Sequence, residues 1–182
     1  MLKFLITGKE YNLKECPQHS GIMVSVASKN LKLMKEYVIF LDIDGVLNTS
    51  KSWKTPFILN DECIRNFCSF VNRDGVHPKI ILTSSWKTGW ASIKKNQTPQ
   101  IIELQEKLSH YNCSVFNRTK DLGNRQKEIM EYLQTHDVDF FVIIDDDDLE
   151  YINFSLKGVF LINAETGFST KDIKRIKWQK NK

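Results

Sequence analysis

The chain has 182 residues, which is enough for one domain with a substantial hydrophobic core and short for two. Its hydrophobic fraction of 41% and charged fraction of 26% are those of an ordinary folded protein and exclude wholesale disorder. Because 26 Lys and Arg residues stand against 22 Asp and Glu, the net charge is +4, a weaker excess than that of dedicated nucleic-acid-binding domains.

Hydropathy and cysteine spacing predict a cytoplasmic protein. No apolar run approaches the roughly 18 residues of a membrane-spanning helix, and the first residues turn polar after Ile6, too early for a secretory signal. The cysteines have no CxxC spacing and no histidine pair at zinc-site spacing; they are Cys16, Cys63, Cys68 and Cys113. This pattern favours reduced thiols in an intracellular protein over a zinc site.

The first part of the chain differs from the rest. Residues 1–36 show weak periodicity, with short apolar pieces separated by a polar stretch. We interpret them as an N-terminal extension, a hairpin or a short helix, packed on a main domain that covers residues 37–182.

The main domain alternates buried strands with helices. Nearly continuous apolar runs predict strands over residues 37–41, 79–82, 139–144 and 159–162, with a shorter strand over residues 113–116. Apolar residues at helical spacing predict helices over residues 61–72, 101–108, 126–133 and 169–178. The alternation predicts a three-layer α/β/α Rossmann-like sandwich with a central parallel sheet, whose site lies at the carboxyl ends of the strands.

Two aspartates follow the first predicted strand directly. If the strand continues, Asp42 and Asp44 point to the same side, where their charges repel. Mg²⁺, which prefers hard oxygen ligands and binds phosphate as well, relieves that repulsion. Gly45, the next residue, permits a sharp turn and the close approach of a ligand.

Polar residues also follow two later strands. Thr83 and Ser84 come after residues 79–82 and suit phosphate oxygens, while Asp145 and Asp146 open an acidic run after residues 139–144. The cations ahead of the next-to-last predicted helix offer a partner for phosphate charge; they are Lys120, Arg125 and Lys127. Each feature alone has an ordinary interpretation as a surface turn, a helix cap or a solvated loop. Their joint position after buried strands favours one shared site.

These motifs resemble those of the haloacid dehalogenase (HAD) superfamily. The run VIFLDIDGVLNT is similar to its first motif, KIILTSS to its second, and Arg125 with the later FFVIIDDDD to its third and fourth. The sequences ILTSSWK, NRQKEIMEYL and TGFSTKDI resemble more narrowly a group of HAD domains without caps, some of which are fused to RNA-repair enzymes. The third-motif cation is usually Lys, so Arg125 is a departure, and Lys120 and Lys127 stay open as alternatives.

The resemblance implies a phosphatase mechanism. Asp42 would be the nucleophile that forms an aspartyl-phosphate, and Asp44 would be the general acid and then the general base. Mg²⁺ would be held by the Asp42 carboxylate, the Asp44 backbone carbonyl and Asp146, with Asp145 as a ligand or an orienting group. Thr83, or else Ser84, would bind phosphoryl oxygens, and Arg125 would screen their charge.

The short segments between the motifs leave no room for a large cap domain, so the resemblance implies an open site and a macromolecular phosphorylated substrate. An aromatic rim of Trp53, Trp86 and Trp90, with Pro56, suits a phosphotyrosine of a phosphoprotein; a nucleic-acid end or a nucleotide is the alternative. The basic segment 171–182 is interpreted as a docked helix with solvated lysines, which gives no strong nucleic-acid or membrane signal.

Two other classes compete with an enzyme. A receiver-like signalling domain also gathers aspartates around Mg²⁺, but its acid pair and its phosphorylated aspartate lie on different strands. This chain instead has its Asp-x-Asp pair after one strand and an acidic run late in the chain, which disfavours a receiver-like domain. A catalytically silent phosphate-binding module is disfavoured because both carboxylates, Asp42 and Asp44, are present.

Overall fold

The computed structural model describes residues 3–6, 9–12, 35–52, 58–152, 154 and 157–181. The chain divides into two compact units, Met1–Lys35 and Glu36–Lys182. In the first unit, β1 (Lys3–Ile6) and β2 (Lys9–Asn12) form an antiparallel hairpin, which is one of the two alternatives predicted for this segment. That the extension packs on the main domain stays a prediction.

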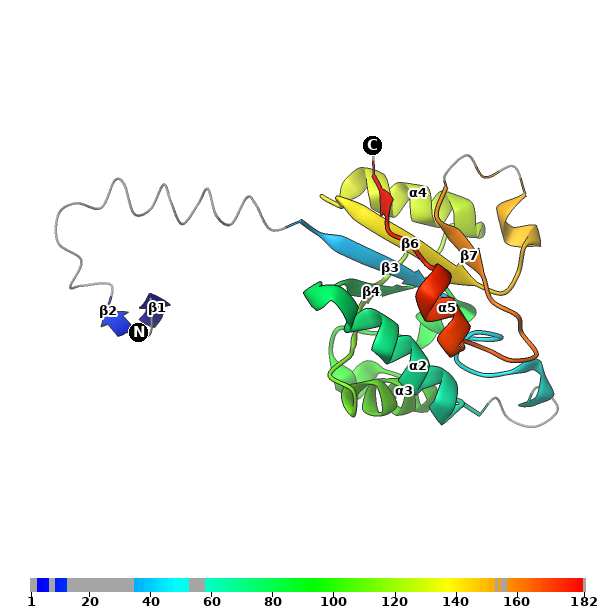
Figure 1. The fold of residues 1–182 in the computed structure, drawn as a ribbon, viewed down its shortest axis with the longest axis horizontal. Coiled ribbons are helices and arrows are strands. Elements are labelled where there is room, and N and C mark those ends of the chain that lie inside the picture. The colour runs from blue at the N-terminus through cyan, green and yellow to red at the C-terminus, as the bar shows by residue number, and fades with distance from the viewer. Residues whose placement is uncertain are drawn as a thin grey trace. The chain divides into compact units, whose positions relative to one another are not determined.

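A parallel sheet forms the centre of the second unit (Figure 1). Its parallel strands among the described residues are β3 (Tyr37–Leu41), β4 (Lys79–Leu82), β5 (Val115–Arg118), β6 (Phe140–Asp145) and β7 (Val159–Leu161). They lie in the order β5-β4-β3-β6-β7, and a short strand, β8 (Gln179–Lys180), pairs antiparallel with the start of β6. The central strands β3, β4 and β6 are the most buried, because they consist almost wholly of Val, Ile, Leu and Phe.

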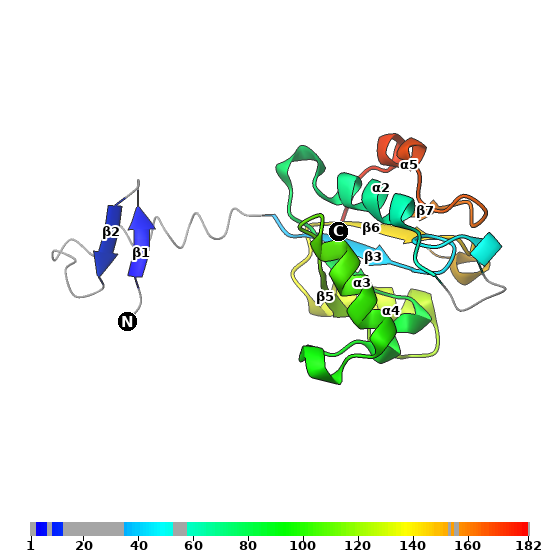
Figure 2. The same cartoon turned by 90° about the horizontal axis from the view of Figure 1, so that it is seen from below.

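Helices cover both faces of this sheet. They are α2 (Asp61–Val71), α3 (Pro99–Ser109), α4 (Arg125–Thr135) and α5 (Thr170–Arg175). Alternate residues of β3 divide between two cores: Ile39 and Leu41 pack with residues of α2 and α3, whereas Val38 and Phe40 pack with residues of α4. Figure 2 shows α2 and α5 on one side of β3 and β6, with α4 on the other. The predicted three-layer α/β/α sandwich is therefore confirmed.

Helix starts follow from local side-chain chemistry. The side chain of Asn60 accepts hydrogen bonds from the backbone N–H groups of Glu62 and Cys63 and so caps α2. Asn124 caps α4 in the same way, with its Oδ1 2.9 Å from the backbone nitrogen of Lys127. Because Arg125 is the first residue of α4, this cap fixes the position from which the Arg125 side chain projects.

The predicted terminal helix over residues 169–178 is wrong over its last three residues. Helix α5 ends at Arg175, and the next residue, Ile176, has an extended backbone and is almost fully buried. Trp178 packs against the same core before the chain enters β8. Burial of these two apolar side chains, together with pairing to β6, outweighs the helical propensity of the surrounding lysines.

The described residues contain no large cap domain. Between β3 and α2 the chain holds a turn and the short 3₁₀ helix Ser50–Ser52. Between β4 and β5 it holds two 3₁₀ segments, Ser85–Gly89 and Lys94–Asn96, and then α3.

No helix in the described part of the chain is long and apolar enough to cross a membrane.

Candidate active site

Hydrogen bonds bring the carboxyl ends of three strands into register. The backbone N–H of Asp42, at the end of β3, donates to Ile144 O of β6 at 3.0 Å. The N–H of Thr83, at the end of β4, donates to Leu41 O at the same distance. The first residue beyond each strand therefore lies at one edge of the sheet, as the sequence predicts.

Three carboxylates meet at this edge. One oxygen from each of Asp42, Asp145 and Asp146 lies within 4.8 Å of the others. Asp42 and Asp145 are buried, at 4% and 0% exposure, and Asp146 is half-buried. Burying like charges together is unfavourable unless a cation joins them.

Arg125 supplies positive charge to the cluster. Its Nη2 lies 3.1 Å from Asp42 Oδ1, and its Nη1 forms an ion pair with Asp145. Arg125 is the first residue of α4, so its guanidinium reaches across the ends of β3 and β6. The structure does not bring the two alternatives here: Lys120 pairs with Glu131 at the surface, and Lys127 is exposed.

Burial and mutual repulsion raise the pKa values of two carboxylates in the cluster. Burial, followed by repulsion from Asp145, raises the pKa of Asp42 well above its usual range, although Arg125 opposes the shift. Burial and then Asp145 also raise the pKa of Asp146, to about 6. The positive charge of Arg125 is therefore too small to offset the burial and mutual repulsion of these two carboxylates.

Asp44 is held by neutral donors. The amide Nδ2 of Asn48 donates to its Oδ1 at 2.8 Å, and the indole Nε1 of Trp86 donates to its Oδ2 at 3.1 Å. Asn48 Oδ1 in turn accepts from the backbone N–H of Gly45 at 2.8 Å. These contacts fix the Asp44 carboxylate in one orientation beside the cluster.

Gly45 is required by the turn. Its φ of +73° lies in the left-handed region, and a Cβ at this position would collide with the Asp146 side chain. The glycine after Asp44 thus allows the β3 turn and the β6 acidic run to touch.

The hydroxyl residues after β4 have different roles. Thr83 Oγ1 is buried and has no hydrogen-bond partner within the described residues. Ser84 instead caps the 3₁₀ turn by accepting from Trp86 N. Ser85 is exposed and lines the same cavity as the acidic cluster. Thr83 lines a neighbouring cavity together with Arg125, where a buried hydroxyl is suited to an anionic ligand, so Thr83 is the better placed of the two predicted residues.

A cavity of about 420 Å³ opens onto the cluster, and we call it the carboxylate cavity; its lining is Asp42, Asp44, Ser85, Arg125, Asp146 and Asp147. It holds both predicted catalytic residues together with the predicted cation.

The donor set fits Mg²⁺. Carboxylate oxygens are the ligands this ion prefers, and Asp42 and Asp146 carry raised pKa values that a divalent cation would reverse. The Asp145 carboxylate is already occupied. Its Oδ2 accepts from Tyr151 Oη at 2.6 Å and pairs with Arg125, and its Oδ1 accepts from Asp147 N at 3.0 Å. This arrangement suits an orienting group better than a free ligand.

Some contributors were missed by the sequence analysis: Asn48, Ser85, Tyr151 and the ion pair of Lys87 with Glu128. Lys87 Nζ lies 2.5 Å from Glu128 Oε2, both side chains are buried, and the pair joins the 3₁₀ turn to α4. Asn48 and Ser85 lie inside the quoted motifs, so proximity to Asp44 and Thr83 was an available signal. Tyr151 lies outside the quoted motifs, and no local sequence pattern predicts its contact with Asp145.

The predicted rim residues Trp53 and Pro56 lie outside the described residues.

Comparison with known families agrees with this geometry. Residues 38–173 match the family described as the HAD domain in Swiss Army Knife RNA repair proteins. The chain belongs to this family. The match runs from β3 into α5 and contains every residue of the carboxylate cavity, and membership in this HAD family points to a hydrolase of the phosphatase type. No curated protein and no solved structure matches the chain.

Proposed function

We propose that this HAD domain is a Mg²⁺-dependent phosphomonoesterase that works through an aspartyl-phosphate on Asp42. The observation that carries the proposal is the meeting of Asp42, Asp145 and Asp146 within 4.8 Å at one sheet edge, beside a cavity large enough for a phosphate. Such a cluster is costly for stability and becomes favourable when it binds a cation and a phosphoryl group.

In the first step, an oxygen of Asp42 attacks phosphorus, and the bond from phosphorus to the leaving oxygen breaks. Asp44, held by Asn48 and Trp86, gives its proton to the leaving oxygen. In the second step, Asp44 takes a proton from water, whose oxygen attacks the same phosphorus. The bond from phosphorus to the Asp42 oxygen breaks, which releases inorganic phosphate and restores the Asp42 carboxylate.

The other residues of the site position the phosphoryl group. The Arg125 guanidinium, 3.1 Å from Asp42, would pair with phosphoryl oxygens as their charge spreads in the transition state. The unpartnered hydroxyl of Thr83 would donate to one of them. A bound Mg²⁺ would be held by Asp42, Asp146 and the Asp44 backbone carbonyl, and would neutralise charge on phosphoryl oxygens.

For the substrate, we favour a phosphate at a nucleic-acid end. The matched family is named for RNA repair proteins, and the described residues carry no large cap that would enclose a small molecule. Phosphotyrosine in a protein stays a prediction, and both substrates belong in the same assay. The receiver-like and silent modules are disfavoured by the Asp42–Asp44 pair, which faces an accessible cavity.

Hydrolysis of p-nitrophenyl phosphate, with and without Mg²⁺, tests the proposal. We expect turnover that needs Mg²⁺, disappears with EDTA and returns when the metal is restored. Asp42→Asn should abolish this turnover, and the exposed Asp137 provides its matched control, because Asp137→Asn removes the same charge away from the carboxylate cavity. Turnover that persists in EDTA would contradict the metal-dependent mechanism.

A further inference from the structure

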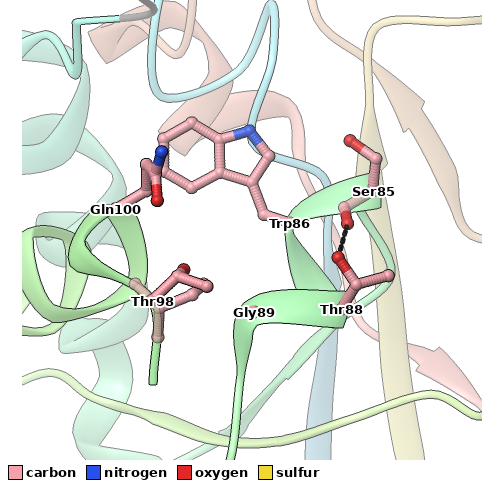
Figure 3. Close-up of a pocket in the computed structure, with 7 residues that line it drawn as sticks. Ser85, Trp86, Thr88, Gly89, Thr98 and Gln100 are labelled. Carbon is pink, nitrogen blue, oxygen red and sulfur yellow. Dashed lines mark hydrogen bonds between the residues drawn. The ribbon is translucent and has the colours of Figure 1, made fainter. Parts of the chain in front are cut away.

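A second cavity lies beside the carboxylate cavity, between the 3₁₀ turn Ser85–Gly89 and the start of α3 (Figure 3). Its volume is about 370 Å³, and its lining includes Ser85, Trp86, Thr88, Gly89, Thr98 and Gln100. We call it the Trp86 cavity. We propose that it binds the terminal nucleobase of a phosphorylated nucleic-acid strand, an inference that rests on the proposed phosphatase function.

The position of the Trp86 cavity fits the leaving group. Ser85 lines both cavities, and Trp86 Nε1 donates to Asp44 Oδ2 at 3.1 Å. In an in-line displacement, the leaving oxygen lies opposite the attacking Asp42 oxygen and next to the acid that protonates it. The group attached to that oxygen is therefore directed past Asp44 towards Trp86.

The lining chemistry fits a base. Figure 3 shows the side chains of Trp86, Thr98 and Gln100 around the same hollow. The half-buried Trp86 indole offers a ring for stacking, and the amide and hydroxyl groups can pair with polar base edges. None of the described residues in the lining is charged. A phenyl ring would use the stacking surface but form no hydrogen bonds with these polar groups.

The walls of the Trp86 cavity are held in place by the chain itself. The Thr98 N–H donates to Gly89 O at 3.0 Å, and Thr88 Oγ1 donates to Ser85 O at 3.1 Å. A Cβ at position 89 would lie 3.2 Å from Thr98 Cβ and closer still to its hydroxyl, so only glycine lets the two walls approach. The Thr98 hydroxyl makes no capping hydrogen bond to α3 and is available to a ligand.

Charge beside the Trp86 cavity favours a strand over an isolated nucleoside phosphate. The hydrogen bond between Thr98 and Gly89 closes the loop of residues 90–97, which carries the exposed Lys94 and Lys95. Neither lysine lines the Trp86 cavity, and Lys94 pairs with Glu106 at 3.3 Å, so Lys95 is the lysine of this loop that would meet the phosphodiester group of the neighbouring nucleotide.

The test compares kcat/KM on defined substrates. They are short oligonucleotides with a 3′-phosphate or a 5′-phosphate, the same oligonucleotides with an abasic terminal sugar, a phosphotyrosine peptide and p-nitrophenyl phosphate. We expect the better of the two ends to be hydrolysed about fivefold to 150-fold more efficiently with its base than without it, the range that stacking on an aromatic ring supplies.

Variants locate the preference. Gln100→Ala should lower the ratio of base-bearing to abasic kcat/KM by about threefold to tenfold, the effect of one lost neutral hydrogen bond. Gln134→Ala is the matched control, since Gln134 is an exposed glutamine on α4 outside this lining, and it should keep the wild-type ratio. Trp86 is left intact because it also holds Asp44.

The outcomes separate the two proposals. Equal rates on base-bearing and abasic ends, a higher rate on the phosphopeptide, or an unchanged ratio in Gln100→Ala would each overturn the nucleobase subsite, while activity on p-nitrophenyl phosphate would leave the phosphatase proposal standing. Failure to hydrolyse any of the substrates with Mg²⁺ would overturn both.

Discussion

Two of the places where the described residues bury carboxylates, the sheet edge and the start of α5, supply the buried charge in opposite ways. At the sheet edge, burial and Asp145 raise the pKa of Asp42. At the start of α5, burial would raise the pKa of Asp172, but hydrogen bonds from Ser169 and Arg175 lower it overall. The α5 acid is supplied with donors: Ser169 Oγ at 2.6 Å, Ser169 N at 2.7 Å and Arg175 Nε at 2.8 Å.

The difference distinguishes structural from functional acids. Asp172 closes a capping box and contributes to stability in its ionised form. The sheet-edge carboxylates share one guanidinium and remain short of positive charge, so their arrangement makes physical sense with a cation and a phosphoryl group present.

Asp42→Asn should give the largest effect. The substitution removes the nucleophile, so kcat/KM on p-nitrophenyl phosphate should fall by about 10⁴-fold or more. Because it also removes a buried like charge, the metal-free variant should unfold at a higher temperature than the wild type. Steady-state kinetics and thermal unfolding measure the two effects. A variant that is both active and less stable would show that Asp42 is a structural acid like Asp172.

Arg125→Ala should lower kcat/KM by about 10²- to 10³-fold, because one charged partner of the transition state is lost. Lys120→Ala and Lys127→Ala are the matched controls and should stay within about twofold of wild type, since surface substitutions away from a site have small effects. A loss in Lys127→Ala as large as that in Arg125→Ala would show that the assignment of the cation is wrong.

Acid should weaken magnesium binding. The pKa of Asp146 is raised to about 6, so protons compete with Mg²⁺ as the pH falls through that value. Metal affinity should fall about tenfold between pH 7 and pH 5, because a ligand has to be deprotonated to bind. Calorimetric titration with Mg²⁺ across this range measures the effect, and pH-independent affinity would exclude Asp146 as a ligand.

Asp172→Asn should give the smallest effect and the opposite pattern. Loss of the capping box should lower the free energy of unfolding by about 0.5–2 kcal/mol and leave turnover unchanged. Since the folded-state pKa of Asp172 is lowered, its stabilisation is complete above the unfolded-state value and disappears as the pH falls through the folded-state value. Urea unfolding of both proteins at neutral and acidic pH tests this; an equal loss at every pH would contradict it.

Much of the fold could be predicted from local pattern. The strands over residues 37–41 and 79–82 lie where the apolar runs lie, because a strand buried on both faces leaves a continuous signal. The C-terminal segment could not be predicted in the same way. Ile176 has helical spacing with Ile173, and only the tertiary burial of Ile176 and Trp178 decides for the extended path and β8.

The candidate site also has a part that could be predicted from local pattern and a part that depends on tertiary packing. Residues that end or directly follow a strand, such as Asp145, Asp42 and Thr83, could be placed at one edge because parallel topology brings strand ends together. The choice of Arg125 over two nearby lysines depends on where α4 begins. The hydrogen bonds of Asp44 with Asn48 and Trp86 depend on side-chain packing that no sequence spacing specifies.

Trapping the covalent intermediate is the sharpest test of Asp42 as the nucleophile. In Asp44→Asn the group that would activate water is absent, and p-nitrophenyl phosphate needs no acid for its leaving group, so an aspartyl-phosphate should accumulate. Reduction with borohydride after mixing with substrate and Mg²⁺ should convert Asp42 to homoserine, as detected by peptide mass spectrometry. We expect this conversion at Asp42 alone and only with substrate; an unmodified Asp42 during turnover, or modification at another aspartate, would show that Asp42 is not the nucleophile.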